Sequence, residues 1–300
     1  LLRSIYRRDF TAFGKVLGRL GGGRELTPEV LKEWYYYFFQ CTECRRCSVF
    51  CPYGIDTADI TMMARELMML VGLNINWIVE PVANCQRTGN HLGIQPHAFK
   101  DMIDFFVDDI EEITGVKLEP SFNRKGADIL FITPSGDVFA DPGTYTCMGY
   151  LMLFHYLKDL GLDITWSTYG SEGGNFGFFT SHETMKRLNS KMYAEAKRLG
   201  VKWILGGECG HMWRVINQYM DTMNGPADFL EEPVNPITGT KFENARSTKM
   251  VHITEFTSDL IQHGKLDLDP SRNDHLKVTF HDSCNPARGM GLFDEPRHVI

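Results

Sequence analysis

The chain has 300 residues, a formal net charge of −7 at pH 7 and 43% hydrophobic residues. This length is enough for about two domains with a buried core. The acidic balance argues against nucleic-acid binding, and the sequence shows neither a membrane-spanning apolar run nor a signal peptide. Four of the eight cysteines lie between residues 41 and 51, which indicates a metal site in a reducing compartment rather than a disulfide framework.

The first predicted element is an amphipathic helix over residues 3–20, followed by glycines at 21–23. We expect its apolar face to pack on the protein's own domain, with a membrane or a partner as the alternative. That face comprises Ile5, Tyr6, Phe10, Phe13, Val16, Leu17 and Leu20. A Thr-Pro-Glu sequence at 27–29 begins a second helix, whose aromatic residues at 34–39 are expected to bury and dry a metal site.

The sequence CTECRRCSVFCP at 41–52 has the C-x2-C-x2-C-x3-C-P spacing of bacterial ferredoxins. Three cysteines of such a run bind one [4Fe–4S] cubane, and in two-cluster ferredoxins the fourth binds the other cluster. We therefore expect Cys41, Cys44 and Cys47 to hold one cubane and Cys51 to serve a second. Zinc is the main alternative, although it favours two separated C-x2-C pairs. Since the chain has a single run and opens on Leu1 rather than Met, we expect a fragment of a longer protein.

Helices are expected at 56–71 and 98–113, and the first 120 residues show no convincing strand. From residue 127 strands and helices alternate, which predicts a parallel sheet with crossover helices. The expected strands are 127–133, 162–169, 201–207 and 276–284, and the expected helices are 144–160, 181–199, 212–223 and 251–264. The fold class is therefore α+β, with an all-α ferredoxin-like domain at 1–120 and an α/β domain at 126–300.

Two of the expected strands end in turns that carry cysteine and histidine: Cys209 with His211, and Cys284 after His281. Because the carboxyl ends of parallel strands form the edge where ligands bind, we expect the two cysteines to share a cofactor site. The histidines are candidates to donate a proton to a leaving thiolate, with hydrogen bonds that cap a turn as the alternative. The segments ILFITPSGD and KVTFHDSCNPARG also resemble each other, with Ser135 near the position of Cys284.

Other features are less specific. Cys85 is either a small buried residue or a further cluster ligand, and Cys147 is expected in the core of an apolar helix. The glycine-rich loop 170–177 follows a strand and precedes a helix, but its spacing matches neither the dinucleotide pattern nor a P-loop. We expect a tight turn near a cofactor there rather than a nucleotide site.

Three segments, CTECRRCSVFCPYGIDTADITMMARE, ILGGECGHMWRV and HDSCNPARGMGL, resemble the heterodisulfide-reductase-like K subunits of Dsr membrane complexes from sulfate-reducing and sulfur-oxidising microbes. The resemblance covers essentially the whole chain. The broader, HdrD-like family joins a helical two-cluster ferredoxin domain to cysteine-rich CCG modules that hold an unusual iron–sulfur cluster. The resemblance implies that residues 126–300 are a CCG-type domain, with a degenerate first module and the start of a second.

Carried over by position, the four cysteines of 41–51 match the second ferredoxin run, and Cys284 matches the opening cysteine of the C-terminal CCG module. In the first module Ser171-Glu172-Gly173 stands where a full module has Cys-Cys-Gly, so that copy keeps only Cys209. The resemblance thus implies one catalytic cluster of the noncubane type, completed by residues beyond 300. Cys209 would be a further ligand or the thiol that meets the substrate sulfur.

The function that the resemblance implies is that of an enzyme. It would receive electrons from a membrane haem-b quinol-oxidising subunit and reduce a disulfide or trisulfide on the small sulfur-carrier protein DsrC, in dissimilatory sulfur metabolism. The alternative is a non-catalytic electron-transfer subunit of a quinone-linked glycerol-phosphate, glycolate or lactate dehydrogenase, since these share the module set. With no predicted span, the protein is expected at the cytoplasmic face of a membrane, held peripherally by partner subunits.

Overall fold

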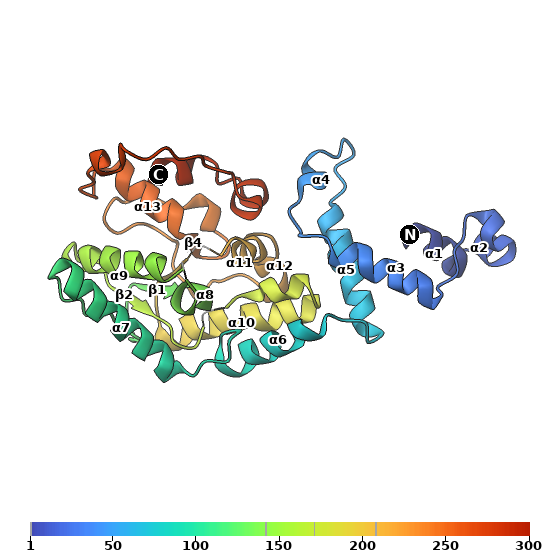
Figure 1. Cartoon of the computed structure of the whole chain (residues 1–300), viewed down its shortest axis with the longest axis horizontal. Helices are drawn as coiled ribbons and strands as arrows, with labels where there is room; N and C mark the ends of the chain where they lie inside the picture. Colours follow the sequence, from blue (N-terminus) through green and yellow to red (C-terminus); the bar gives the residue numbers. More distant parts are fainter. Residues whose placement is uncertain (1, 142, 171, 208) are drawn as a thin grey trace.

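The computed structural model describes residues 2–141, 143–170, 172–207 and 209–300 (Figure 1). Helices and short helical turns make up the regular structure as far as residue 114. They are α1 (Leu2–Phe10), α2 (Ala12–Leu17), η1 (Gly18–Gly21), α3 (Pro28–Phe39), α4 (Arg46–Val49), α5 (Thr57–Leu70), α6 (Asn76–Thr88) and α7 (Pro96–Thr114). None of the helices in the described ranges combines the length and the apolar character that crossing a membrane requires.

Local capping explains where two of these helices begin. Thr27 Oγ1 accepts the backbone N–H of Val30 at 3.4 Å, ahead of a proline in the first turn of α3. Asp56 caps α5 by accepting the N–H of Ala58 at 3.0 Å. Helix α6 was not predicted, since Pro81 lies inside it and a proline usually ends a helical pattern.

The prediction of one packed helix over residues 3–20 is wrong in two respects. The chain breaks at Thr11, whose Oγ1 accepts the N–H of Gly14 at 3.0 Å and so starts a new helix, α2. The apolar residues then no longer share one face, and only Ile5 is buried among them. Val16 and Leu20 are 83% and 92% exposed, so this surface does not pack on the described part of the domain.

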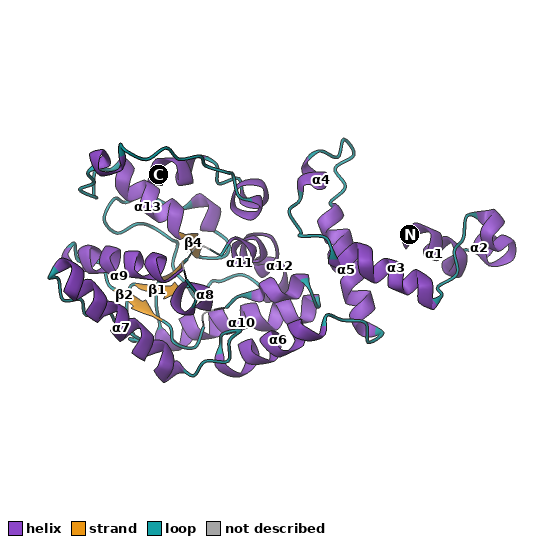
Figure 2. Ribbon diagram, viewed as in Figure 1, coloured by secondary structure: helices purple, strands orange, loops and turns teal. Residues whose placement is uncertain are grey.

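A small parallel sheet forms the centre of the second half of the chain (Figure 2). Its strands are β1 (Ile129–Ile132), β2 (Ile164–Trp166), β3 (Trp203–Gly206) and β4 (Met250–His252), in the order β2-β1-β3-β4. Each neighbouring pair is parallel, with Ile129 opposite both Ile164 and Trp203. An all-parallel sheet in a largely helical chain confirms the α+β class. The order also places β2 and β3 on opposite sides of β1, which makes the β1–β3 boundary a topological switch point.

Helices surround this sheet (Figure 1). They are α8 (Ser135–Phe139), α9 (Gly143–Asp159), α10 (His182–Leu199), α11 (Gly210–Val215), α12 (Asp221–Asn224), α13 (Ile253–Gln262) and α14 (Asp294–Val299). Shorter turns are η2 (Gly174–Phe178), the π-helical η3 (Ile216–Met220), η4 (Glu243–Ala245), η5 (Pro270–Asn273) and the π-helical η6 (Cys284–Gly289). The expected helices at 144–160, 181–199 and 212–223 are therefore confirmed within one or two residues at most ends.

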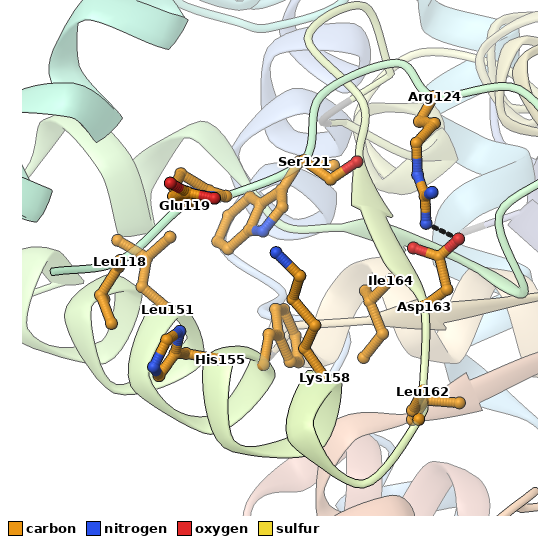
Figure 3. Close-up of a pocket in the computed structure, with 14 residues that line it drawn as sticks. Leu118, Glu119, Ser121, Arg124, Leu151, His155, Lys158, Leu162, Asp163 and Ile164 are labelled. Atoms are coloured by element: carbon orange, nitrogen blue, oxygen red, sulfur yellow. Dashed lines mark ion pairs between the residues drawn. The ribbon is translucent and has the colours of Figure 1, made fainter.

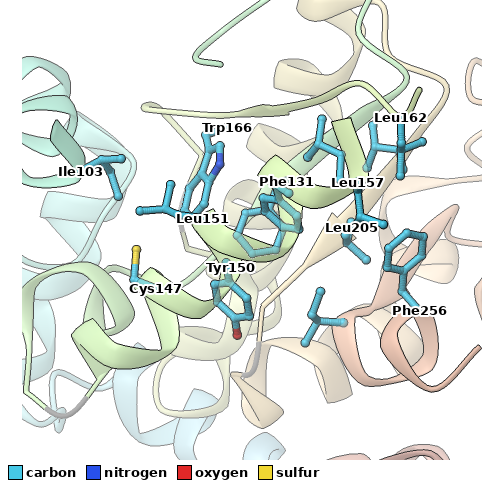
Figure 4. Packing of buried hydrophobic residues seen from close by; sticks show 14 of the residues in the cluster. Ile103, Phe131, Cys147, Tyr150, Leu151, Leu157, Leu162, Trp166, Leu205 and Phe256 are labelled. Carbon is cyan, nitrogen blue, oxygen red and sulfur yellow. The ribbon is translucent and has the colours of Figure 1, made fainter. Parts of the chain in front are cut away.

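The two faces of the sheet pack into different cores, because successive strand residues point in opposite directions. Phe131 faces α7, α9 and α13, whereas Leu130 faces α10 and α11. Figure 4 shows the first core, in which the Phe131 ring centroid lies 4.7 Å from that of Trp166. Cys147 is fully buried there, as expected. Since α7 also joins this core, the division into 1–120 and 126–300 stays a prediction.

The predicted strand over 276–284 is wrong. The segment has no regular structure before η6, and Leu276, Val278 and Phe280 remain between 42% and 70% exposed. Alternating residues form a strand only beside a partner, and this segment runs along α13 instead of the sheet (Figure 1). The fourth strand is β4, which the sequence analysis took as the start of the helix at 251–264.

His252 at the end of β4 gives a testable prediction. It is buried, its Nδ1 caps α13 by accepting the N–H of Thr254 at 3.1 Å, and burial lowers its pKa to about 3. The unfolded state therefore binds this proton more readily, so stability is lost as pH falls below about 6.5. Between pH 6.5 and 5 we expect His252→Asn, which keeps a capping acceptor, to lose about 1.5 kcal/mol less stability than the wild type. Urea unfolding at both pH values measures this, and parallel pH slopes would contradict it.

Candidate functional site

The four cysteines of the ferredoxin-like run lie between α3 and α5. Cys41 and Cys44 are in a loop, Cys47 is in α4, and Cys51 follows α4 directly. Cys47 is exposed and the other three are half-buried, and none of the cysteines in the described part of the chain forms a disulfide. These thiols are therefore placed where a cofactor can reach them.

The backbone of this loop is held in an unusual conformation. Glu43 and Arg45 both have φ of 57°, in the left-handed region that residues with a side chain rarely adopt. Left-handed residues that alternate with right-handed ones turn successive N–H groups toward one side, and such concavities bind anions and iron–sulfur clusters. The loop thus has the backbone shape of an anion-binding site.

Backbone N–H groups of the loop donate to cysteine sulfurs. The Glu43 nitrogen lies 3.4 Å from Cys41 Sγ. The N–H of Arg46 is the main cause that lowers the pKa of the Cys44 thiol; burial opposes it, and the Thr42 side chain and the Arg288 charge add to it. Both contacts favour thiolates, the form that binds iron.

This donor set fits a cubane cluster. It combines thiols at ferredoxin spacing, N–H donors to sulfur and a concave backbone. Within the described residues, no three Cys, His, Asp or Glu side chains converge on a position that suits one metal ion. In a cubane each thiolate binds a different iron atom, so the ligands stand farther apart than around a single ion.

The carbonyl groups of the same loop are each bound by a basic side chain. The bonds join Arg65 to Cys41, His211 to Thr42, Arg214 to Glu43, and Arg288 to Cys44 at 2.9 Å. In a trans peptide the C=O and the following N–H point in opposite directions. The carbonyl of Thr42, held by His211, therefore leaves the N–H of Glu43 in the same peptide on the side of Cys41 Sγ.

These four side chains come from distant parts of the sequence. Arg65 is in α5, His211 and Arg214 are in α11, and Arg288 is in η6, the turn that begins with Cys284. Arg288 and Cys44 are 244 positions apart. The cysteine loop is thus bound to the segments that carry the other two predicted cysteines.

A buried carboxylate lies behind the loop. Glu43 is 1% exposed, with its oxygens 3.4 Å from Arg65 Nη1 and 3.6 Å from Arg214 Nη1. Neither oxygen makes a hydrogen bond. Burial raises the pKa of Glu43 to about 7, although both arginines oppose this. The Arg214 guanidinium also lies 4.7 Å from the Phe178 ring centroid, so it is packed as well as paired.

The structure brings the two predicted catalytic turns together, but not in the way the sequence predicted. Cys209 follows β3 and caps α11, as expected at a strand end. Cys284 instead begins the π-turn η6, because no strand precedes it. A Cβ atom on Gly210 would lie 2.9 Å from Pro286, so residues adjacent to the two cysteines are in contact. A shared site of Cys209 and Cys284 stays a prediction that this contact supports.

The predicted histidines have different environments. His211 is half-buried and donates to the Thr42 carbonyl, and burial lowers its pKa. This contact is to the cysteine loop, and the role of His211 in proton transfer stays a prediction. His281 is exposed to solvent. Cys85 is buried in α6 and Cys147 in α9, and burial raises the pKa of both thiols.

A cavity of about 490 Å³ opens at the carboxyl ends of β1 and β3. Cys209 lines it together with His91, Asp137, Asp141 and Glu172. The sequence analysis gave His91 no role, because it lies in a loop without a recognisable motif.

Hydrogen bonds connect three residues at this cavity. Glu172 Oε1 accepts the N–H of Ser135 at 3.1 Å and also its hydroxyl, and it lies 2.8 Å from His91 Nδ1. The hydrogen bond with Glu172 raises the pKa of His91, and burial opposes it. The resemblance to CCG modules implies cysteine positions at Ser135 and Glu172, and this is the signal that could have pointed to the network. Ser171, the other such position, lies outside the described residues.

A second cavity, of about 430 Å³, lies beside α9 and the start of β2 (Figure 3). Its polar side chains include His155, Lys158 and the ion pair of Arg124 with Asp163. The described residues that line it contain no thiol, and it lies at the amino end of β2. It is therefore separate from the cysteine chemistry.

Comparison with known proteins supports the family that the motifs suggested. No family model and no solved structure matches the chain. It is 48% identical over 313 residues to an Hdr-like menaquinol oxidoreductase iron-sulfur subunit of Archaeoglobus profundus. It is 49% identical over 314 residues to a second protein of that type, from Archaeoglobus fulgidus. The chain is homologous to these Hdr-like subunits along its whole length. It spans 56% and 57% of their lengths, respectively.

More distant relatives share parts of this pattern. A stretch of 52 residues is 42% identical to a dihydromethanophenazine:CoB–CoM heterodisulfide reductase chain of Methanosarcina mazei and covers 17% of this chain. An EtfAB:quinone oxidoreductase of Syntrophomonas wolfei is 24% identical over 283 residues, which cover 87% of this chain and 33% of that protein. The chain is thus similar to Hdr-like subunits, and the specific Dsr assignment stays a prediction.

The buried pair of Glu43 and Arg214 yields a stability prediction. Arg214→Met leaves the Glu43 carboxylate buried with one cation instead of two, and we expect a loss of about 3 kcal/mol in the free energy of unfolding. Adding Glu43→Gln should not recover this loss, because it leaves the buried Arg65 guanidinium without its carboxylate partner. Urea unfolding is the measurement, and Arg246→Met at an exposed ion pair is the control, with an expected effect below about 1 kcal/mol. An equally small effect at Arg214 would show that the pair does not hold the loop.

Proposed function

We propose that this chain is an iron–sulfur electron-transfer subunit of a membrane quinol-oxidising complex, and that its electrons reduce a sulfur–sulfur bond. The observation that carries the proposal is the ferredoxin-spaced cysteine loop, bound by Arg288 to the turn of Cys284. The full-length similarity to Hdr-like menaquinol oxidoreductase iron-sulfur subunits supports the quinol side of the complex. The partner would be a membrane haem-b subunit, and the chain would associate peripherally with the cytoplasmic face.

The ferredoxin loop is the proposed entry point for electrons. Cys41, Cys44 and Cys47 would hold one cubane and Cys51 would serve another; such a cluster supplies one-electron transfer when bound. The residues of this chain orient the thiolates through backbone N–H groups. Trp34 of α3 is 5% exposed and packs with Ile5 and Met68, whereas Tyr36 and Tyr37 are 61% and 60% exposed, so shielding of the site by this aromatic run stays a prediction. Positive charge beside a cluster favours its reduced, more negative form, whereas exclusion of water opposes it.

The second site would be the junction of the β3–α11 turn with η6. Cys284 is the proposed ligand of a noncubane catalytic cluster, and Cys209 is a further ligand or a substrate thiol. Cleaving a disulfide to two thiols takes two electrons and two protons. His211 holds the loop, and His281 is a remaining candidate to deliver a proton. The proposed substrate is a disulfide or trisulfide on a small sulfur-carrier protein of the DsrC type, in dissimilatory sulfur metabolism.

A second candidate is a non-catalytic electron-transfer subunit of a quinone-linked dehydrogenase. The similarity to an EtfAB:quinone oxidoreductase favours it, although only 24% of aligned residues are identical. The two functions differ in one measurable product. In the intact complex, a menaquinol analogue should drive release of sulfide from a trisulfide carrier only under the first.

The cubane assignment is tested by cysteine substitution in the full-length protein purified without oxygen. We expect Cys44→Ser to lower the iron content by about one cluster and to alter one cubane signal in paramagnetic resonance spectra. Cys51→Ser should alter a different cubane, because the fourth cysteine serves the other cluster.

The matched control is Cys85→Ala, a buried thiol of α6, which should leave the iron content unchanged. Unchanged iron and spectra in Cys44→Ser would refute the cluster site. An effect of Cys51→Ser on the Cys44 cluster alone would refute only the cross-ligation.

A further inference from the structure

The cavity at Cys209 lies where the fold itself favours a ligand. In doubly wound sheets, ligands bind at the carboxyl ends of strands at the switch point, because neighbouring loops leave in opposite directions there. The switch point of this sheet is between β1 and β3. The cavity lies there, and its volume of about 490 Å³ falls within the range of small-ligand pockets.

The side chains at this cavity form a thiol and acid–base arrangement. Cys209 is a half-buried thiol from the turn after β3. His91 lines the same cavity, and its Nδ1 is engaged by Ser135 and Glu172. The carboxylate of Glu172 fixes the ring, so Nε2 is the nitrogen left to meet a molecule in the cavity. A histidine held in this way by a carboxylate is suited to proton transfer.

The charge of the cavity restricts what enters it. Asp137, Asp141 and Glu172 line it, and the described lining residues include neither lysine nor arginine. His91 is the one basic side chain among the described lining residues, so carboxylates outnumber it and the cavity favours neutral or cationic groups over anions. Sulfur oxyanions and disulfides that carry carboxylates are therefore poor ligands.

We propose that Cys209 is a thiol–disulfide exchange site for a disulfide flanked by positive charge. The Cys209 thiol gives its proton to His91, and the thiolate attacks one sulfur of the disulfide RS–SR. The bond Cys209–S–S–R forms, the RS–SR bond breaks, and the leaving RS⁻ takes the proton from His91. No electron enters or leaves in this exchange. A later reduction of the mixed disulfide would use electrons delivered by the proposed electron-transfer function. Only that later step of the inference rests on the proposed function.

Three small disulfides of similar size test the proposal on the full-length protein with its clusters, kept free of oxygen. They are cystamine, which is cationic, bis(2-hydroxyethyl) disulfide, which is neutral, and 3,3′-dithiodipropionate, which is anionic. Mass spectrometry of the Cys209 peptide measures the rate of mixed-disulfide formation. At low salt we expect cystamine to react at least tenfold faster than the anion. Asp141→Asn and added salt should both lower the ratio of the cystamine rate to the 3,3′-dithiodipropionate rate, since both weaken the repulsion between the cavity carboxylates and the anionic probe.

Variants of the network separate its role from simple packing. His91→Gln should slow exchange by cystamine about tenfold or more, and Glu172→Gln should slow it as well, with unchanged iron content. Cys209→Ser should abolish the modification. Equal rates for the cationic and anionic probes would overturn the charge assignment.

The inference would be overturned if Cys209 reacted with none of the three probes and Cys209→Ser had a lower iron content. Cys209 would then be a cluster ligand. That result would leave the proposed function standing. Normal exchange in a complex that does not transfer electrons to sulfur would instead overturn the proposed function alone.

Discussion

Four consecutive peptide carbonyls, from Cys41 to Cys44, are bound by three arginines and by His211, and the conformation of the cysteine loop depends on these bonds. In the peptide that joins Thr42 to Glu43, the N–H opposite the bound carbonyl lies on the side of Cys41 Sγ, at 3.4 Å. The loop could not keep two non-glycine residues at positive φ without such support, because each costs of order 1–3 kcal/mol. Fixing the carbonyls therefore also fixes the thiols. The buried Glu43 offsets part of the positive charge, so the cations remain in place without solvent.

The same bonds connect the turn after β3 to the cysteine loop. Within six residues it places Cys209 at the cavity, Gly210 against Pro286, and His211 and Arg214 on the cysteine loop. Tight packing permits this, since a side chain on Gly210 would collide with the turn of Cys284. A displacement of the residues at one end of this turn should therefore also displace the residues at the other end. The cysteine loop and the cavity are thus joined by six consecutive residues.

Residue spacing and capping residues in the sequence predicted those elements whose position depends on neighbouring residues in the chain. Cysteine spacing located the ferredoxin loop, and capping residues such as Thr27 located helix starts. The strand predicted at 276–284 is absent from the structure. Alternation of apolar and polar residues shows that a segment could form a strand, but not that a partner strand lies beside it. The arginine contacts could not be predicted, since a side chain bound to a backbone carbonyl leaves no pattern in the residue that it binds. His91 was missed for a related reason: its partner Glu172 is 81 positions away, and only the folded sheet brings them together.

The two ends of the β3–α11 turn differ in charge, because one end lies at the cysteine loop and the other at the cavity. The end at the cysteine loop is basic, which suits thiolates and an anionic cluster. The end at the cavity is acidic, and the backbone N–H of Ser135 donates to Glu172 there. A buried carboxylate there is stable because it accepts hydrogen bonds from both the backbone and the hydroxyl of Ser135 and bonds to His91. The crevice itself does not depend on those residues, because strand order creates it. The side chains that line it, which include Asp137, Asp141 and Glu172, therefore decide the charge of what enters.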